Sequence, residues 1–147
     1  MMPSRPSRTL DIGIQKMWMK RWFSDFRFRR SKGSFFWEGV LQPRDASPQY
    51  HIRIQYRGLK TPVVTVLSPA LVPRAKHTYR NGSLCLFYLP DRSWTPGSLI
   101  AETIVPWTAV WLYCYEFWLD DPSCWYNEEA PHLGKRSIQE GVWNRTI

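Results

Sequence analysis

Hydrophobic and polar residues alternate most regularly over residues 50–57, where Tyr, Ile, Ile and Tyr take turns with His, Arg, Gln and Arg. Strict alternation is typical of a strand with one buried face. Residues 35–41 carry apolar side chains at alternate positions and predict a strand before it, and the β-branched residues 62–67 predict a strand after it. Because the connections are short, we expect the three strands to form an antiparallel meander.

Two flanking segments show a helical period instead. Thr9 is a suitable N-cap for a helix that extends to about Phe28. Its apolar residues share one face of such a helix: Leu10, Ile14, Met17, Trp18 and Trp22. A second helix is expected over residues 98–119, which Glu102, Pro106 and Glu116 interrupt too often for a membrane span. The order of elements predicts an α+β fold with the helices on one side of the sheet.

The length and cysteine usage fit a single intracellular domain. With 147 residues the chain can bury a core without disulfides or metal. We expect residues 1–8 to be a flexible lead-in and residues 9–147 to form one domain. Three cysteines without a close pair, and a polar N-terminus without an apolar signal segment, favour a reducing, cytoplasmic location.

The net charge of +8 comes almost entirely from the first part of the chain. Residues 1–32 contain nine Lys or Arg and two Asp, whereas residues 113–130 contain five Asp or Glu and no Lys or Arg. A nucleic-acid-binding module is therefore one alternative, but the sequence has no RNP-like motif, zinc-finger spacing or recognition-helix signature. A docking surface for an acidic partner fits the basic first helix better.

Cys85 is the strongest candidate for chemistry. It follows an Asn81-Gly82 turn signal, lies between two leucines and has His77 eight positions upstream. A free cysteine is often only a small buried hydrophobe, whereas a nucleophilic one needs an accessible loop and a group that favours the thiolate. The glycine turn places Cys85 in such a loop, so we interpret it as a nucleophile.

The other cysteines and histidines support no second chemistry. Cys114 lies in an apolar helical pattern and is expected in the core, and the role of Cys124 stays open. No Cys or His pair has the usual zinc spacing, so no metal site is expected. A papain-like hydrolase that pairs Cys85 with His132 would need a longer chain and a family signature that is absent here. The sequence also lacks a phosphate-binding glycine loop, and no cofactor is expected.

The order of elements and motifs resembles the ubiquitin-conjugating-enzyme (UBC) fold over residues 9–119. In that family a His-Pro-Asn tripeptide precedes the catalytic cysteine and a Trp-Ser-Pro follows it. Here residues 77–79 stand at the tripeptide, Cys85 stands at the nucleophile and residues 94–96 read Trp-Thr-Pro. The chain is more similar to the bacterial branch found in CBASS antiphage operons beside a cGAS-like nucleotidyltransferase, in the short form without a fused activating-enzyme domain.

The resemblance implies a cysteine-dependent conjugating enzyme. Cys85 would form a thioester with a protein C-terminus, that of the cGAS-like nucleotidyltransferase, and pass it to an acceptor lysine. A separate activating enzyme is a further candidate partner, and no membrane partner is expected. The resemblance also implies that the first helix docks the partner protein through its basic residues: Lys16, Lys20, Arg21 and Arg27.

One departure from the family motif bears on catalysis. Tyr79 stands where the family has the asparagine that stabilises the oxyanion, a contribution worth roughly 3 kcal/mol. The Tyr79 hydroxyl, Asn81 or backbone N–H groups are candidate replacements, and His77 is either a base or a structural histidine. The departure leaves a second hypothesis, a non-catalytic adaptor of the same fold that binds a protein tail.

Overall fold

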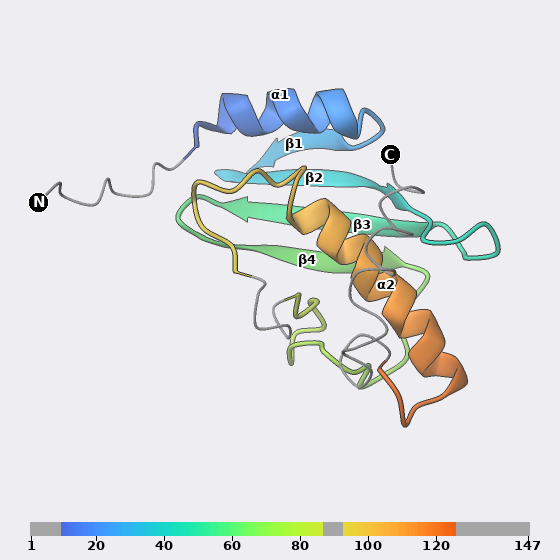
Figure 1. Ribbon diagram of the computed structural model, residues 1–147. Helices are drawn as coiled ribbons and strands as arrows, with labels where there is room; N and C mark the ends of the chain where they lie inside the picture. Colours follow the sequence, from blue (N-terminus) through green and yellow to red (C-terminus); the bar gives the residue numbers. More distant parts are fainter. Residues whose placement is uncertain (1–9, 87–92, 126–147) are drawn as a thin grey trace, which may run out of the picture.

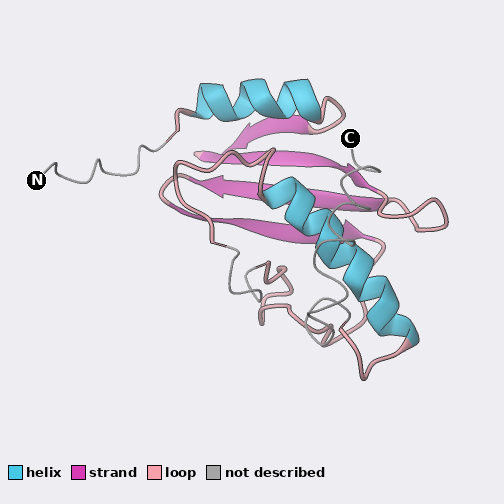
Figure 2. Cartoon of the chain, in the orientation of Figure 1, coloured by secondary structure: helices cyan, strands magenta, loops and turns pink. Residues whose placement is uncertain are grey.

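The computed structural model describes residues 10–86 and 93–125 and consists of a four-stranded antiparallel sheet with two helices (Figures 1 and 2). The strand order is the order in the chain. The elements are α1 (Ile12–Trp22), β1 (Arg27–Ser31), β2 (Ser34–Leu41), β3 (Tyr50–Arg57), β4 (Lys60–Ser68) and α2 (Ile104–Asp120).

One face of the sheet is buried and the other is open to solvent. A row of apolar partners crosses all four strands on the buried face: Phe28, Trp37, Ile54 and Val64. On the opposite face Arg53 pairs with Glu38 at 2.8 Å. The alternation predicted over residues 50–57 is therefore confirmed, because every second side chain of β3 enters the core.

The sheet has four strands, so the prediction of three strands after a helix to Phe28 is wrong. Helix α1 ends at Trp22, and the chain turns through residues 23–26 into β1, which pairs with β2. The turn sits close to the sheet, since a Cβ on Gly39 of β2 would lie 2.5 Å from the Phe26 ring. Strand β1 was missed because Phe28 alone faces inward among its Arg and Ser residues.

Helix α1 also presents a different face to the core than its apolar pattern predicts. The helix begins at Ile12 with Asp11 as N-cap, and Thr9 lies outside the described residues. Its buried side chains are Gln15 and Met19, whereas three residues of the apolar face are exposed: Ile14, Met17 and Trp22. The helix therefore does not turn its whole apolar face toward the sheet.

Gln15 explains this orientation. It is 0% exposed, its Nε2 donates to the Ser98 carbonyl at 2.9 Å, and its Oε1 accepts from the Ile100 N–H at 2.9 Å. A buried amide needs such partners, and only this rotation of α1 provides them. Pro96 adds a third tie, because its carbonyl accepts from the Leu10 N–H at 3.0 Å. The segment before α2 is thus fixed to α1.

Helix α2 crosses the buried face of the sheet (Figure 1). It begins at Ile104, later than the predicted residue 98, because Pro106 lacks an N–H and its ring would clash with the carbonyl four residues earlier in a longer helix. Residues 99–103 form turns instead, with the Thr103 N–H bonded to the Leu99 carbonyl. Cys114 is buried in α2 as predicted. Neither described helix has the length and hydropathy to cross a membrane.

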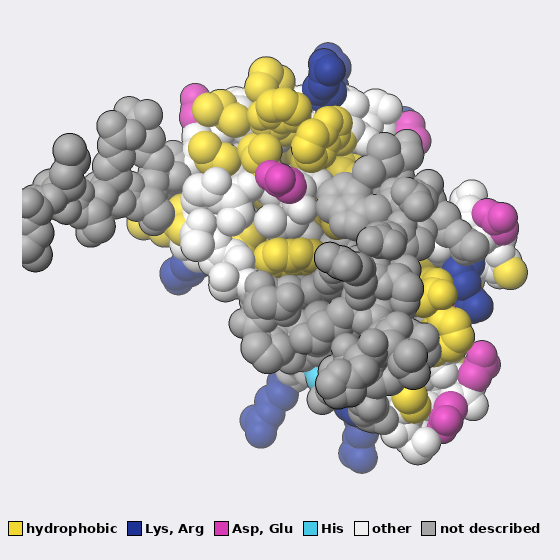
Figure 3. Space-filling model, viewed as in Figure 1, with side chains coloured by type: hydrophobic (Ala, Val, Ile, Leu, Met, Phe, Trp, Pro, Cys, Tyr) yellow, Lys and Arg dark blue, Asp and Glu magenta, His cyan; other side chains and the backbone are white. Residues whose placement is uncertain are grey.

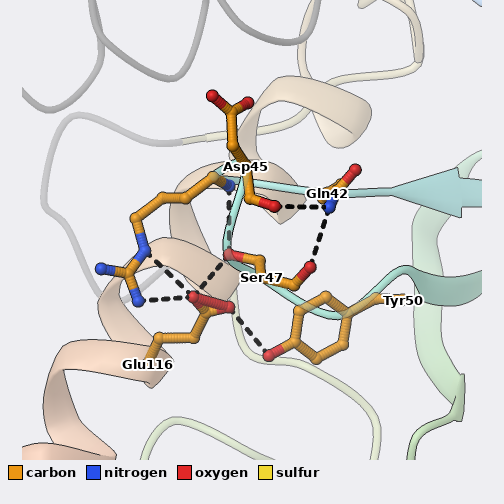
Figure 4. Close-up of polar contacts among 6 residues, drawn as sticks. Gln42, Asp45, Ser47, Tyr50 and Glu116 are labelled. Atoms are coloured by element: carbon orange, nitrogen blue, oxygen red, sulfur yellow. Dashed lines mark hydrogen bonds and ion pairs between the residues drawn. The ribbon is translucent and has the colours of Figure 1, made fainter.

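A buried carboxylate joins α2 to the loop between β2 and β3 (Figure 4). Glu116 Oε1 accepts from Arg44 Nη2 at 2.8 Å and from Ser47 Oγ at 2.6 Å, and its Oε2 accepts from the Tyr50 hydroxyl at 3.0 Å. Burial, followed by the Glu116 charge and hydrogen bond, raises the pKa of Tyr50. Gln42 Nε2 bonds the carbonyls of residues 45 and 47, which closes the loop.

We predict that Glu116→Gln lowers the free energy of unfolding by about 2 kcal/mol, because the neutral amide loses charge-assisted bonds to Arg44. Urea denaturation measures the change. Asp120→Asn, at the exposed end of the same helix, is the matched control and should shift the free energy by no more than about 0.5 kcal/mol. Equal effects of the two variants would contradict a stabilising role for this cluster.

Candidate active site

The segment after β4 brings Cys85 to the edge of the sheet. Leu84 donates its N–H to the Val64 carbonyl at 2.9 Å, so the chain runs beside β4 at that point. Thr78 and Leu84 form an isolated antiparallel bridge, and the Cys85 N–H donates to the His77 carbonyl at 2.9 Å. Residues 77–85 therefore form a narrow hairpin-like loop, which we call the Cys85 loop.

The Asn-Gly signal forms the tip of this loop. Tyr79 and Ser83 are joined by a backbone bond of 2.8 Å, and the Gly82 N–H bonds the Tyr79 carbonyl at 2.9 Å. Asn81 Oδ1 accepts from the Ser83 N–H at 3.0 Å and from its hydroxyl at 2.6 Å. Gly82 has φ of +86°, a conformation that favours glycine. The predicted turn is therefore present, and the Asn81 carbonyl oxygen is used to hold it.

His77 anchors the loop through its backbone. Its carbonyl accepts from Cys85 and also from Trp111 Nε1 of α2, at 3.1 Å. Its φ of +55° lies in the left-handed region that non-glycine residues rarely adopt. The imidazole packs edge-on against Trp125, with ring centroids 4.9 Å apart. His77 is thus held from both sides, by α2 and by the segment that follows α2.

Cys85 lies between two buried residues of the chain, Leu84 and Leu86, and is itself half-buried. Because neighbouring side chains of an extended chain point to opposite sides, the buried leucines direct the Cys85 side chain away from the core. This is the accessible position that a nucleophilic thiol requires.

Tyr79 lies on the same loop as the thiol and interacts with it. The interaction with the Cys85 side chain, followed by partial burial and the Cys85 charge, raises the pKa of Tyr79 above its usual 10.0. Tyr79 therefore stays a neutral phenol at physiological pH. The stabilisation from this interaction is complete below pH 10 and is lost as the pH rises through the raised pKa.

The Trp-Thr-Pro segment supports the site from the side of α1. The Thr95 N–H bonds Ser98 Oγ at 3.2 Å, and the Ser98 N–H returns a bond to the Thr95 carbonyl at 2.8 Å. Trp94 packs against the core as a partly buried side chain. These contacts place the segment in a structural role.

The structure places the remaining predicted residues as follows. Lys16, Lys20 and Arg21 are exposed on α1, whereas Arg27 is the first residue of β1 and not part of the helix as predicted. Cys124 is half-buried in the turn after α2, and His132 lies outside the described residues. Within residues 10–86 and 93–125, no group of three or more His, Cys, Asp or Glu side chains is arranged to hold a metal ion.

Two supporting residues were missed by sequence reasoning. Trp111 and Trp125 are 0% exposed and pack against each other at an angle near the Cys85 loop, with ring centroids 5.3 Å apart. The high tryptophan content of the sequence indicates that buried indoles support the fold. It does not predict which indole N–H donates to a loop carbonyl.

We predict that Tyr79→Phe slows alkylation of Cys85 by iodoacetamide about threefold at neutral pH. The phenylalanine removes a hydrogen-bond donor next to the reacting sulfur, a loss worth about 0.65 kcal/mol of barrier, which corresponds to a threefold change in rate. Mass spectrometry of the modified peptide measures the rate. Tyr113→Phe on α2 is the control, and an unchanged rate in Tyr79→Phe would show that the hydroxyl does not act on the thiol.

The comparisons with known proteins agree with the fold and with the position of the loop. A family model described as Type II CBASS E2 protein matches residues 15–133, which include the whole sheet, the Cys85 loop and α2. No curated protein matches the chain. The family implies a UBC-like fold and an E2-like conjugation role in antiphage defence. With most of its length matched, the chain belongs to the Type II CBASS E2 protein family.

Proposed function

We propose that Cys85 is the nucleophile of an acyl transferase that carries a protein C-terminus as a thioester. The observation that carries this proposal is the placement of a half-buried thiol between two buried leucines, on a loop that hydrogen bonds fix to β4 and α2. A cysteine that only filled space would not need an accessible position on such a loop.

The chemistry proceeds in two acyl transfers. The Cys85 thiolate attacks the carbonyl carbon of a donor already activated as a thioester on a separate activating enzyme, whose thiolate leaves. The amine of an acceptor lysine then attacks the new thioester, loses a proton and expels the Cys85 thiolate, which forms an isopeptide bond. Splitting one amide formation into two exchanges at sulfur lowers each barrier. The sequence has no phosphate-binding glycine motif for activating the donor itself.

The loop residues take separate roles in this scheme. Tyr79 donates to the sulfur and lies where it can donate to the oxyanion that forms next to it, in place of the family asparagine. Asn81 shapes the turn through Oδ1, and its amide N–H groups are a second donor to the oxyanion. His77 acts as a positioning residue. Its carbonyl accepts the hydrogen bond from the Cys85 N–H, and its ring packs against Trp125.

The donor in this proposal is the C-terminus of a cGAS-like nucleotidyltransferase, and α1 is the docking surface. Arg21 lies beside an apolar row formed by Ile14, Trp18 and Trp22. Lys16 and Lys20 project from the other side of the helix, where they line a hollow with Phe28. Figure 3 shows hydrophobic side chains gathered over the region of α1, with Lys or Arg beside them. A helix that exposes an apolar row on one side and cations on another suits a protein partner with an acidic surface.

We predict a thiol-labile protein adduct on Cys85. The chain is co-expressed with the neighbouring genes of its operon, and intact mass is measured with and without reductant. Wild type should carry an adduct that reductant removes, Cys85→Ala should carry none, and Cys124→Ser should behave as wild type. Absence of an adduct, together with full antiphage defence by Cys85→Ala, would identify a binding adaptor instead of a transferase.

We predict that Lys20→Glu and Arg21→Glu each lower the rate of adduct formation about two- to fivefold at limiting donor, because each removes one attraction to an acidic partner. The loss should shrink at high salt. Lys60→Glu, at the first residue of β4, makes the same charge change away from α1 and serves as the control. Equal losses in all three variants would show that net charge, not α1, governs docking.

A further inference from the structure

A groove of about 700 Å³ lies between the outer edge of β4 and the segment that leads into the Cys85 loop. Residues 65–67 form one wall and residues 70–75 form the other. Residues 78–82 of the Cys85 loop, with Tyr79 and Asn81 among them, close one end. The groove therefore ends at the loop that carries the thiol.

The described residues give this groove a positive charge. Arg74 and Arg80 line it, and within residues 10–86 and 93–125 no Asp or Glu does so. Its apolar surface includes the half-buried Leu71 and the buried Ala75. Figure 3 shows Lys or Arg side chains projecting from the lower edge of the molecule, where the segment after β4 lies. An apolar groove with two arginines suits an extended peptide segment that carries a carboxylate.

A second hollow of about 370 Å³ lies on the other side of Tyr79 and Asn81. Its lining extends to Leu84 and Leu86, the two residues that flank Cys85, whereas the lining of the larger groove stops at Gly82. The lining of neither hollow includes Cys85, and both linings share Tyr79 and Asn81 of the Cys85 loop. Each hollow therefore reaches this loop from one side, and the larger one, with its two arginines, is the one that suits an acidic segment.

We propose that the larger groove seats a segment of the acceptor protein, with an acidic residue on Arg74 and Arg80 and the lysine to be modified reaching over Tyr79 to the thioester. This inference rests on the proposed conjugating function and adds the acceptor class. A carboxylate close in sequence to the lysine would bind the arginines through paired N–H···O bonds and would fix the amine next to the reacting carbonyl.

Disulfide trapping tests the groove without any donor. The probe is a short synthetic peptide with a cysteine in place of the acceptor lysine, activated as a mixed disulfide with thionitrobenzoate and flanked by Glu, Gln or Lys. The Cys85 thiolate attacks the peptide sulfur, a new disulfide forms, and the released thionitrobenzoate is followed by absorbance. The protein carries Cys124→Ser, and the same protein with Cys85→Ala gives the background rate.

We expect the Glu peptide to react about tenfold faster than the Gln peptide, and the Lys peptide to react slowest. In Arg74→Gln/Arg80→Gln the preference for Glu should fall to about twofold. Arg29→Gln/Lys32→Gln, on β1 and in the turn after it, removes the same charge elsewhere and should keep the full preference. Thermal unfolding confirms that each variant is folded.

Two outcomes of trapping overturn the inference. One is an undiminished preference in Arg74→Gln/Arg80→Gln, and the other is an equal loss in the β1 control, which would show long-range attraction only.

Loading and discharge of the thioester provide the second experiment. The inference predicts normal loading and slower discharge to lysine in Arg74→Gln/Arg80→Gln, so impaired loading would assign the groove to the donor and overturn it. If wild type forms no thioester at all, the proposed function itself fails, whatever the trapping result.

Discussion

The site depends on one carbonyl oxygen. The His77 carbonyl accepts one hydrogen bond from the Cys85 N–H and another from the Trp111 indole. The first bond closes the Cys85 loop, and the second fixes that loop to α2. Leu84 adds the tie to Val64 of β4. The thiol is therefore positioned by backbone atoms and a buried tryptophan.

Much of the fold was predictable from the sequence. Where one face of the sheet is covered and the other meets water, the buried side chains follow the alternation of apolar and polar residues. Strand β3 alternates as expected, since one of its faces meets the core and the other meets water. The prediction failed where one polar contact outweighs several apolar residues. Gln15 is buried to bond Ser98 and Ile100, which rotates α1 and leaves Ile14 and Trp22 exposed. No hydrophobic period contains that information.

The candidate site was predictable in part for a similar reason. Asn81 and Gly82 encode a turn through local chemistry, so the loop around Cys85 could be expected from the sequence. The contact between Tyr79 and the thiol joins residues six positions apart across that turn, and it depends on the geometry of the closed loop. The Trp111 anchor comes from α2 and could not be placed by any local signal. Local motifs therefore locate the candidate nucleophile, and tertiary packing decides what surrounds it.

The two edges of the sheet are closed by different means. At β4 the Cys85 loop covers part of the edge through Leu84, whereas β1 at the other edge carries Arg27, Arg29 and Arg30. Charged side chains on an edge strand keep it from pairing with the edge of another molecule. The basic residues of β1 thus protect the protein from aggregation, so their charge is a requirement of solubility that holds even where no partner binds. Surface residues can therefore change to fit a new partner more freely on α1 than on β1.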